Sequence, residues 1–240
     1  MTISQVIRFY KKIGETPLQA VERFRLENPL FSDEKITYAG RLDPLAEGEM
    51  IFLTGEKCKE KEQFLSLDKV YMVDVLFGIS TDTHDVLGFV DDYDKESVTF
   101  DKSILKDFII QYEQKYPLFS SKTIKQAREG IRINEKDIPV KTVTVYDISC
   151  IKEYEISTKD LQNNIFDTIR LVSGDFRQKE IIEKWQEFFD ENKKENFSVV
   201  TLRVHCSSGT YMRVLADMIG KKLGTKALAL HIKREKIILD

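Results

Sequence analysis

Residues 199–224 read VVTLRVHCSSGTYMRVLADMIGKKLG and combine the signals of a strand, a tight turn and a helix. Apolar and polar residues alternate up to Cys206, as in a strand with one buried face. After a Ser-Ser-Gly-Thr turn, apolar side chains recur at helical spacing until Leu223, and Gly224 is suited to end a helix. We therefore expect a strand that ends at Cys206 and a helix that runs from about Tyr211 to Leu223.

The rest of the chain alternates irregularly between strand and helix patterns. Alternation predicts strands over residues 69–77 and 140–148, and residues 78–88 have the composition of a polar loop. Capping signals and helical spacing predict three further helices: one after Thr16 that buries Leu18, Val21 and Phe24, one after Asp101 that buries Ile104, Leu105, Phe108, Ile109 and Tyr112, and one near 178–192 around Trp185. Because a parallel sheet needs a steadier rhythm, we predict an α+β fold with a mixed, mostly antiparallel central sheet flanked by helices.

The composition describes a folded, highly charged chain of 240 residues, of which 42% are hydrophobic and 32% charged. No apolar run reaches the roughly eighteen residues of a membrane-spanning helix, and the N-terminus lacks a secretion signal. The three cysteines lie far apart, which favours free thiols, so we expect a cytoplasmic protein. The net charge of −3 gives no general attraction for nucleic acid, and such a partner needs a local basic patch.

Several kinds of chemistry leave no trace in the sequence. There is no Walker-type phosphate loop, no dinucleotide-binding glycine fingerprint and no nucleophile elbow of a serine hydrolase. The three histidines, His84, His205 and His231, lack the spacing of metal ligands. We therefore expect no metal and no organic or nucleotide cofactor. If the chain is an enzyme, a carboxylate is its expected reactive group.

Three segments carry residue types suited to such chemistry. Residues 37–48, TYAGRLDPLAEG, hold Asp43 between glycines and directly before a proline, which restricts the backbone. Tyr71 lies at the start of a strand, and Arg213 falls in the first turn of a helix, where the helix dipole disfavours a cation unless a carboxylate pairs with it. Taken singly, each has a plain alternative: a surface Asp turn, a Tyr at the edge of the core, and an Arg extended into solvent.

Together these segments resemble the TruB family of pseudouridine synthases, which isomerise uridine 55 in the T-loop of tRNA. The loop around Asp43 is similar to the catalytic-aspartate motif of the family. Residues 69–71, KVY, and 77–88, FGISTDTHDVLG, resemble its second motif, and residues 206–217, CSSGTYMRVLAD, resemble its third. The matches follow the order of the family over most of the chain, so the set is far more specific than any one of them.

The resemblance implies the pseudouridine-synthase catalytic fold and roles for five residues. It implies Asp43 as the nucleophile and Arg213 as the group that pairs with it. Tyr71 would stack on the target base, Tyr211 would line the pocket, and Ile232 falls where the family usually has Leu packed against the active site. These residue types suit the reaction, because a carboxylate can attack the sugar or base, a guanidinium favours its charged form, and an aromatic ring receives a flipped-out base.

The implied partner is RNA, with tRNA the expected class, bound by a monomer that needs no membrane and no nucleotide cofactor. The first candidate RNA-binding cluster comprises Lys122, Lys125, Arg128 and Arg132, and a second comprises Lys221, Lys222, Lys226, Lys233 and Arg234. A solvated helix face is the alternative for each cluster. Phosphate contacts from such groups would make binding fall steeply with salt.

The chain also departs from the family pattern. Residues 11–16 and 116–121 give only weak likenesses, with Lys12 in the place of the usual Pro, and Tyr38 stands where the family has His. We expect residues 1–240 to form a single catalytic domain with an insertion at about 155–197 and without the C-terminal RNA-binding domain that many relatives carry.

Two other functions stay open at this point. A catalytically idle RNA-binding or RNA-folding module would keep the scaffold, although neither base stacking nor phosphate binding requires Asp43. A carboxylate-dependent nucleoside hydrolase also cleaves a C1′ bond, usually with a second carboxylate at a defined separation. Loss of product in Asp43 variants argues against the first alternative, and release of free uracil indicates the second.

Overall fold

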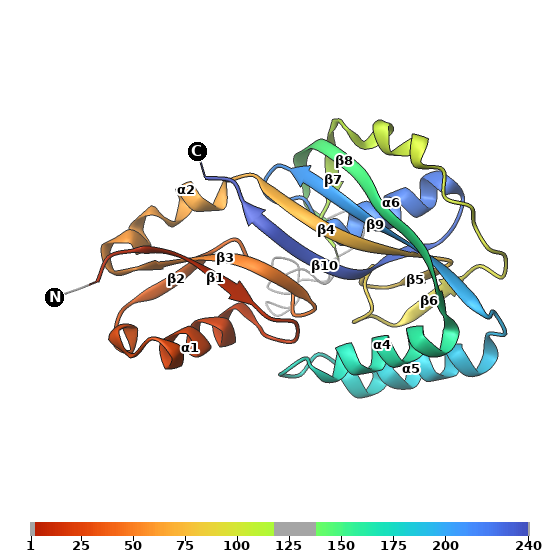
Figure 1. Ribbon diagram of the computed structural model, residues 1–240, viewed down its shortest axis with the longest axis horizontal. Helices are drawn as coiled ribbons and strands as arrows, with labels where there is room; N and C mark the ends of the chain where they lie inside the picture. The colour runs from red at the N-terminus through yellow and green to blue at the C-terminus, as the bar shows by residue number, and fades with distance from the viewer. Residues whose placement is uncertain (1–2, 118–137, 240) are drawn as a thin grey trace.

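The computed structural model describes residues 3–117 and 138–239. A twisted sheet runs through the molecule in the order β1-β3-β10-β4-β9-β8-β7, with β2 paired to β3 and a small β5–β6 sheet beside it (Figure 1). The strands are β1 (Val6–Lys11), β2 (Ile36–Ala39), β3 (Ala46–Thr54), β4 (Lys69–Phe77), β5 (Ile79–Thr81), β6 (Val90–Tyr93), β7 (Gln111–Lys115), β8 (Val140–Ser157), β9 (Asn196–Cys206) and β10 (Ala227–Ile237). Among the strand pairs of the described residues, β3 with β10 is parallel and the others are antiparallel. The predicted α+β class with a mixed, mostly antiparallel sheet is confirmed.

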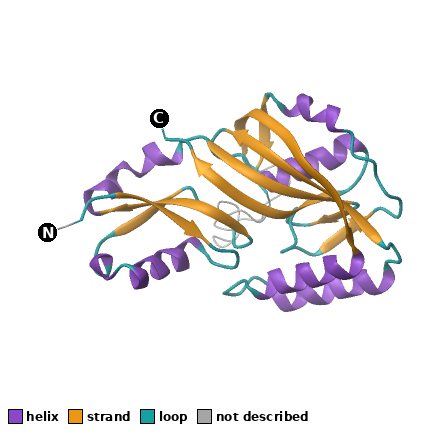
Figure 2. Cartoon of the chain, in the orientation of Figure 1, coloured by secondary structure: helices purple, strands orange, loops and turns teal. Residues whose placement is uncertain are grey.

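Helices cover both faces of this sheet (Figure 2). They are α1 (Pro17–Glu27), α2 (Lys61–Leu65), α4 (Thr158–Arg170), α5 (Gln178–Glu191) and α6 (Met212–Leu223), with short 3-10 helices η1 (Pro29–Phe31), η2 (Gly55–Glu60) and η3 (Lys102–Phe108). Side chains of α1 and α6 share one buried cluster with Val73 and Val75 of β4. Leu76 of the same strand belongs to a second cluster, formed with α4 and α5. Successive residues of β4 thus serve two cores, and the sheet lies between them. No helix of the described residues is long and apolar enough to cross a membrane.

The segment from β9 to α6 forms as its sequence predicts. Strand β9 ends at Cys206, α6 begins at Met212, and Gly224 adopts a φ of 74° at the C-terminal cap. Helix α1 also begins as expected, because the Thr16 hydroxyl accepts a hydrogen bond from the backbone N–H of Gln19 and the side chain of Gln19 returns one to Thr16. These elements follow from local signals alone.

Three expectations were wrong in detail. Leu18 does not face the core: it is 61% exposed, and the buried side of α1 instead includes Ala20, Val21 and Phe24. The helix after Asp101 is only the 3-10 helix η3, because the chain turns after Phe108 and Tyr112 already belongs to β7. Residues 78–88 are not a simple polar loop, since they contain β5 and pack Ile79 and Val86 into the core.

A glycine allows β3, from the first quarter of the sequence, to pair closely with β10, from its end. Gly48 of β3 lies opposite Arg234 of β10. Its φ is +118°, and a Cβ at this position would lie 2.1 Å from the carbonyl oxygen of Arg234. Only glycine allows so close an approach of the two backbones. This contact brings the loop before β3, which carries Asp43, next to the sheet that supports α6.

Candidate active site

The loop that carries Asp43 connects β2 to β3 and is held by its own backbone. The N–H of Ala46 donates to the carbonyl of Asp43 at 3.0 Å, which closes a turn at Pro44. The N–H of Gly14 donates to the carbonyl of Pro44 at 2.9 Å from the far side. The Asp43 side chain is 41% exposed. The loop is therefore fixed while its carboxylate stays accessible.

Lys11 also holds the Asp43 loop, through hydrogen bonds to carbonyls of its backbone. Its side chain is fully buried, and its Nζ donates to the carbonyls of Pro44 at 3.2 Å and Ala46 at 2.6 Å. Burial lowers the pKa of Lys11 to about 8, although the charges of Glu15 and Asp43 act in the opposite direction. No role for Lys11 followed from the sequence, and the signal that could have found it was the weak motif over residues 11–16.

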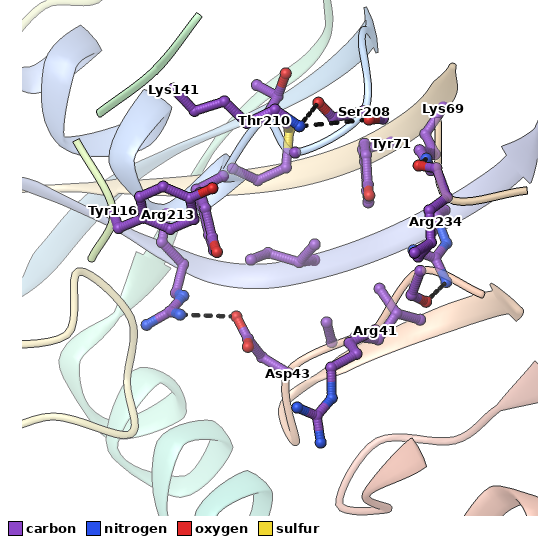
Figure 3. Close-up of a pocket in the computed structure, with 18 of the residues that line it drawn as sticks. Arg41, Asp43, Lys69, Tyr71, Tyr116, Lys141, Ser208, Thr210, Arg213 and Arg234 are labelled. Atoms are coloured by element: carbon purple, nitrogen blue, oxygen red, sulfur yellow. Dashed lines mark hydrogen bonds and ion pairs between the residues drawn. The ribbon is translucent and has the colours of Figure 1, made fainter. Parts of the chain in front are cut away.

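Arg213 lies opposite Asp43 at the start of α6. Its Nη2 atom is 2.9 Å from Oδ2 of Asp43, and its side chain is only 4% exposed (Figure 3). Its Nη1 donates to the carbonyl of Thr83 at 2.9 Å. Burial opposes the charge of Arg213, but the carboxylates of Asp43 and Asp85 raise its pKa above the ordinary value. The carboxylate partner expected for an Arg in a first helical turn is present.

Asp85 is a second partner of Arg213 that the sequence analysis missed. Its Oδ2 is 3.4 Å from Nε of Arg213, and its Oδ1 accepts hydrogen bonds from the Thr83 hydroxyl at 2.7 Å and from the backbone of Leu87 at 2.9 Å. Burial raises the pKa of Asp85, while Arg213 and Thr83 lower it. The residue lies in the second motif, but nothing in the local sequence indicated what its side chain contacts.

A cavity of about 530 Å³ opens in front of this ion pair. All five active-site residues implied by the resemblance line it: Asp43, Tyr71, Tyr211, Arg213 and Ile232. They come from the β2–β3 loop, from β4, from the N-terminal boundary of α6 and from β10. Its volume is typical of a site for a small ligand or one nucleotide. The structure therefore brings together residues that are up to 189 positions apart, as the sequence numbers of Asp43 and Ile232 show.

Three tyrosines, Tyr71, Tyr116 and Tyr211, line the cavity, and the first and third are those implied by the resemblance. Tyr71 is 8% exposed on the sheet floor, and burial raises its pKa, while Arg234 lowers it through its charge and a hydrogen bond. Tyr211 is held by Gln114 of β7, whose Oε1 accepts from the Tyr211 N–H at 2.7 Å and whose Nε2 donates to the Tyr211 carbonyl at 3.3 Å. Gln114 thus holds the backbone of Tyr211, a contact that no pattern in the sequence indicated.

The cavity is rich in cations. Arg41, Lys69, Lys141, Arg213 and Arg234 line it, against the acidic side chains of Asp43 and Glu62. Lys69 and Arg234 lie at the end away from Asp43, with Tyr71 between (Figure 3). Burial lowers the pKa of Lys69 to about 8, and the charge of Arg234 adds to this. A chain with a net charge of −3 thus concentrates positive charge at this pocket.

The structure describes only one of the two basic clusters that were expected to bind RNA. Lys122, Lys125, Arg128 and Arg132 lie outside the described residues. In the second cluster, Lys221 pairs with Asp217, Lys222 with Asp107 and Lys226 with Asp92 at 2.7, 3.0 and 2.6 Å. Lys233 lies over the ring of Tyr10, and Arg234 is buried at the cavity. The second cluster is therefore not one free basic surface, and its contribution to the site is Arg234.

Metal-binding groups are not part of the described site. Within residues 3–117 and 138–239, no three or more His, Cys, Asp or Glu side chains are grouped so that they could hold a metal ion. His205 and Cys206 follow the expected alternation, with Cys206 buried and His205 partly exposed.

Comparisons with known proteins agree with this geometry. The model of the TruB family pseudouridylate synthase N-terminal domain matches residues 28–167. The chain is similar to the tRNA pseudouridine synthase B of Caldicellulosiruptor saccharolyticus, with 29% identity over 94% of this chain and 64% of that protein. It is also similar to that of Parabacteroides distasonis (29% identity, 97% of this chain, 85% of that protein) and of Aquifex aeolicus (31%, 95% and 66%). The chain thus spans about two thirds of the length of two of these relatives.

Solved structures show the same fold. A Cbf5-Nop10-Gar1 complex contains a chain that superimposes with a TM-score of 0.58 at 19% identity, over 97% of this chain and 48% of that one. An H/ACA RNP bound to a substrate RNA containing 2'-deoxyuridine gives a TM-score of 0.55 at 18% identity, over 97% of this chain and 47% of that one.

Proposed function

Because the chain belongs to the TruB family of pseudouridine synthases, we propose that it converts a flipped-out uridine of RNA to pseudouridine with Asp43 as the nucleophile. The observation that carries the proposal is the 2.9 Å ion pair between an accessible Asp43 and a buried Arg213 at the edge of a nucleotide-sized cavity. A carboxylate must be charged, aimed and reachable to attack a bound nucleotide, and this pair provides all three conditions.

The reaction is an isomerisation, so substrate and product have the same atoms. Asp43 attacks C1′ of the ribose or C6 of the uracil, the C1′–N1 bond breaks, and the base turns within the cavity. A bond then forms between C5 and C1′, Asp43 is released, and the proton lost from C5 is balanced by one gained at N1. The cavity must hold the free base between the two bond changes, and Ile232 and Tyr71 provide apolar walls for it.

Tyr71 is proposed to hold the base and to move the proton. Base stacking on an aromatic ring contributes roughly 1–3 kcal/mol. The Tyr71 hydroxyl can relay the proton by giving its own toward N1 as it takes the one released at C5, so that it ends the step protonated as it began.

The cationic end of the cavity supports RNA as the substrate class. Lys69, Lys141 and Arg234 line the cavity together with Tyr71. Their head groups already donate to backbone carbonyls, so they would favour a polyanion through their positive charge rather than through free donors, and arginine stays charged even when it is buried. The relatives named tRNA pseudouridine synthase B support tRNA, and we propose uridine 55 of the T-loop as the target.

The test is to incubate the purified protein with a T-arm RNA and with total cellular RNA, and to map pseudouridine by a chemical stop specific for it. Asp43→Asn, which keeps the shape of the side chain, is the matched control. We expect a stop at the T-loop uridine with the wild-type protein and none with the variant. Stops only at other positions would overturn the tRNA assignment. Free uracil would identify a hydrolase, and equal inactivity of both proteins would favour an idle RNA-binding module.

A further inference from the structure

A helical hairpin lies beside the candidate active site without contributing a side chain to its cavity. Helices α4 and α5 extend from the far end of the β8–β9 pair, where Ser157 lies opposite Asn196, and fold back side by side along the sheet (Figure 1). Their connecting loop, residues 171–177, points toward β1 and β3. The hairpin belongs to the region that the sequence analysis expected to be an insertion.

One end of the hairpin supports the loop of Asp43. The N–H of Ser173 donates to the carbonyl of Gly14 at 3.2 Å, and the N–H of Gly14 donates to the carbonyl of Pro44, next to Asp43, at 2.9 Å. The approach is close, because a Cβ on Gly14 would lie 2.2 Å from the carbonyl oxygen of Leu171. In addition, Leu45 is buried in the same apolar cluster as Val172 of the hairpin.

The middle of the hairpin supports the loop of Asp85. Trp185 of α5 is fully buried, and its indole N–H donates to the carbonyl of Val86 at 3.1 Å. Arg177 lies 3.5 Å from the carboxylate of Asp82 and stacks over the ring of Phe89. The hairpin therefore contacts both sides of the segment that places Asp85 against Arg213.

The charge of α5, one of the two helices of the hairpin, does not fit a grip on RNA. Helix α5 carries five acidic side chains and two basic ones, namely Glu180, Glu183, Glu187, Asp190 and Glu191 against Lys179 and Lys184. Lys184 is further paired with Glu187 at 2.6 Å. Such a face repels phosphates, so the contribution of the hairpin lies in its packed side.

We propose that the α4–α5 hairpin is a brace that holds the Asp43 loop and the Asp85 loop in fixed relation, and that Trp185 is a positioning residue for the Asp43–Arg213 pair. Arg213 is held by Asp85 and by the carbonyl of Thr83 on one side and by Asp43 on the other. Its guanidinium meets Asp43 at the right angle only if both loops keep their separation. The catalytic part of this inference rests on the proposed function, whereas the mechanical link between the loops does not.

The experiment compares Trp185→Phe with Phe166→Leu. The first variant keeps an aromatic ring but loses the N–H that bonds Val86. The second weakens ring contacts that lie within the hairpin, since Phe166 packs on Phe189 and lies beneath Arg170. We expect Trp185→Phe to lower kcat about five- to tenfold with KM unchanged, and Phe166→Leu to leave kcat within about twofold. Because Trp185 is the only tryptophan, its emission checks that the hairpin stays packed in Phe166→Leu.

Two further measurements separate positioning from general loss of stability. Hydrogen exchange should speed up in Trp185→Phe over residues 82–89, where the Val86 carbonyl loses the indole N–H, and also over 40–46, which has no hydrogen bond with Trp185. It should speed up over neither segment in Phe166→Leu. In an Asp85→Asn background, Trp185→Phe should have almost no further effect on kcat. Unchanged hydrogen exchange over residues 40–46 would overturn the brace. It would also be overturned if Trp185→Phe lowered kcat by the same factor in the Asp85→Asn background as in the wild type. If Trp185→Phe speeds up exchange over both segments but the wild-type protein makes no pseudouridine, the brace stands and the proposed function is overturned.

Discussion

The two walls of the cavity hold their charged groups in opposite ways. On the β2–β3 wall, Asp43 is 41% exposed and its position is set by backbone hydrogen bonds of the loop. On the facing wall, Arg213 is 4% exposed and Asp85 10%, and both are held by side chains and buried carbonyls. The group proposed to react is open to substrate, and the groups that aim it are closed to water.

This difference has a physical reason. Ion pairs strengthen when water is excluded, but a buried charge without a partner is costly. Asp85 and the carbonyl of Thr83 keep Arg213 paired even when Asp43 turns to a substrate atom. Because Arg213 keeps these buried partners, Asp43 can stay exposed and free to react.

After the loss of product expected for Asp43→Asn, the largest effect is expected for Arg213→Lys. A lysine carries the same charge but a single donor group, so it cannot bridge Asp43 and Asp85 as the planar guanidinium does. We expect kcat to fall about 10²- to 10³-fold, the size typical of losing a fixed electrostatic partner in an active site. Turnover of the T-arm RNA measures it. Arg8→Lys, at an exposed ion pair with Glu49, is the control and should keep full activity. Near wild-type turnover in Arg213→Lys would show that a point charge suffices.

The next largest effect is expected where the two walls meet. Gly48→Ala places a methyl group 2.1 Å from the carbonyl oxygen of Arg234 at a φ of +118°. We expect the free energy of unfolding to fall by about 2–4 kcal/mol, because both strain and a backbone clash are introduced. Gly224→Ala is the matched control: its φ is +74° and no atom lies within 4 Å of the added methyl. It should lose only about 1 kcal/mol. Equal losses in urea unfolding would mean that the β3–β10 contact can relax.

The sequence predicted the facing wall better than the wall of Asp43. The β9–α6 segment follows from alternation, turn residues and Gly224, which are all local signals. The pairing of Arg213 with a carboxylate followed from its place against the helix dipole. Strands β1 to β3 and β10 were not predicted, because their pairing joins residues near 48 to residues near 234, and no local pattern records such a contact.

Other gaps had different causes. Helix α4 was overlooked although Leu161, Ile165 and Ile169 recur at helical spacing after the Ser157 cap. Asp85 could not be recognised as a partner of Arg213, because 128 positions separate them and only the folded loop turns its carboxylate inward. Leu18 was assigned to the core because it fits the apolar spacing, yet it falls on the open side of the first turn of α1. Periodicity shows which face of a helix is apolar, but contacts with the rest of the fold decide which residues of that face are buried.

A smaller effect is expected on the floor between the walls. Tyr71→Phe keeps the ring on which the base is proposed to stack but removes the hydroxyl near Arg234. We expect KM to stay within about twofold and kcat to fall about tenfold, because proton relay is lost while stacking remains. Tyr71→Leu should in addition weaken RNA binding by about 1–2 kcal/mol. Filter binding and single-turnover kinetics separate the two variants. If both variants lose binding equally, the hydroxyl rather than the ring holds the base.

The smallest effect is expected at Lys11, the buried charge of the Asp43 wall. Burial lowers its pKa from 10.5 to about 8, so between these pH values the unfolded chain keeps a proton that the native protein has released. Stability due to this group therefore rises with pH across the window. The free energy of unfolding of the wild type, relative to Lys11→Met, should increase by about 1 kcal/mol from pH 7 to pH 9. Taking the difference removes the contributions of Lys69 and Cys206, which are common to both proteins. A flat difference in urea unfolding would mean that Lys11 is solvated, and the loop of Asp43 would then rest on its backbone contacts alone.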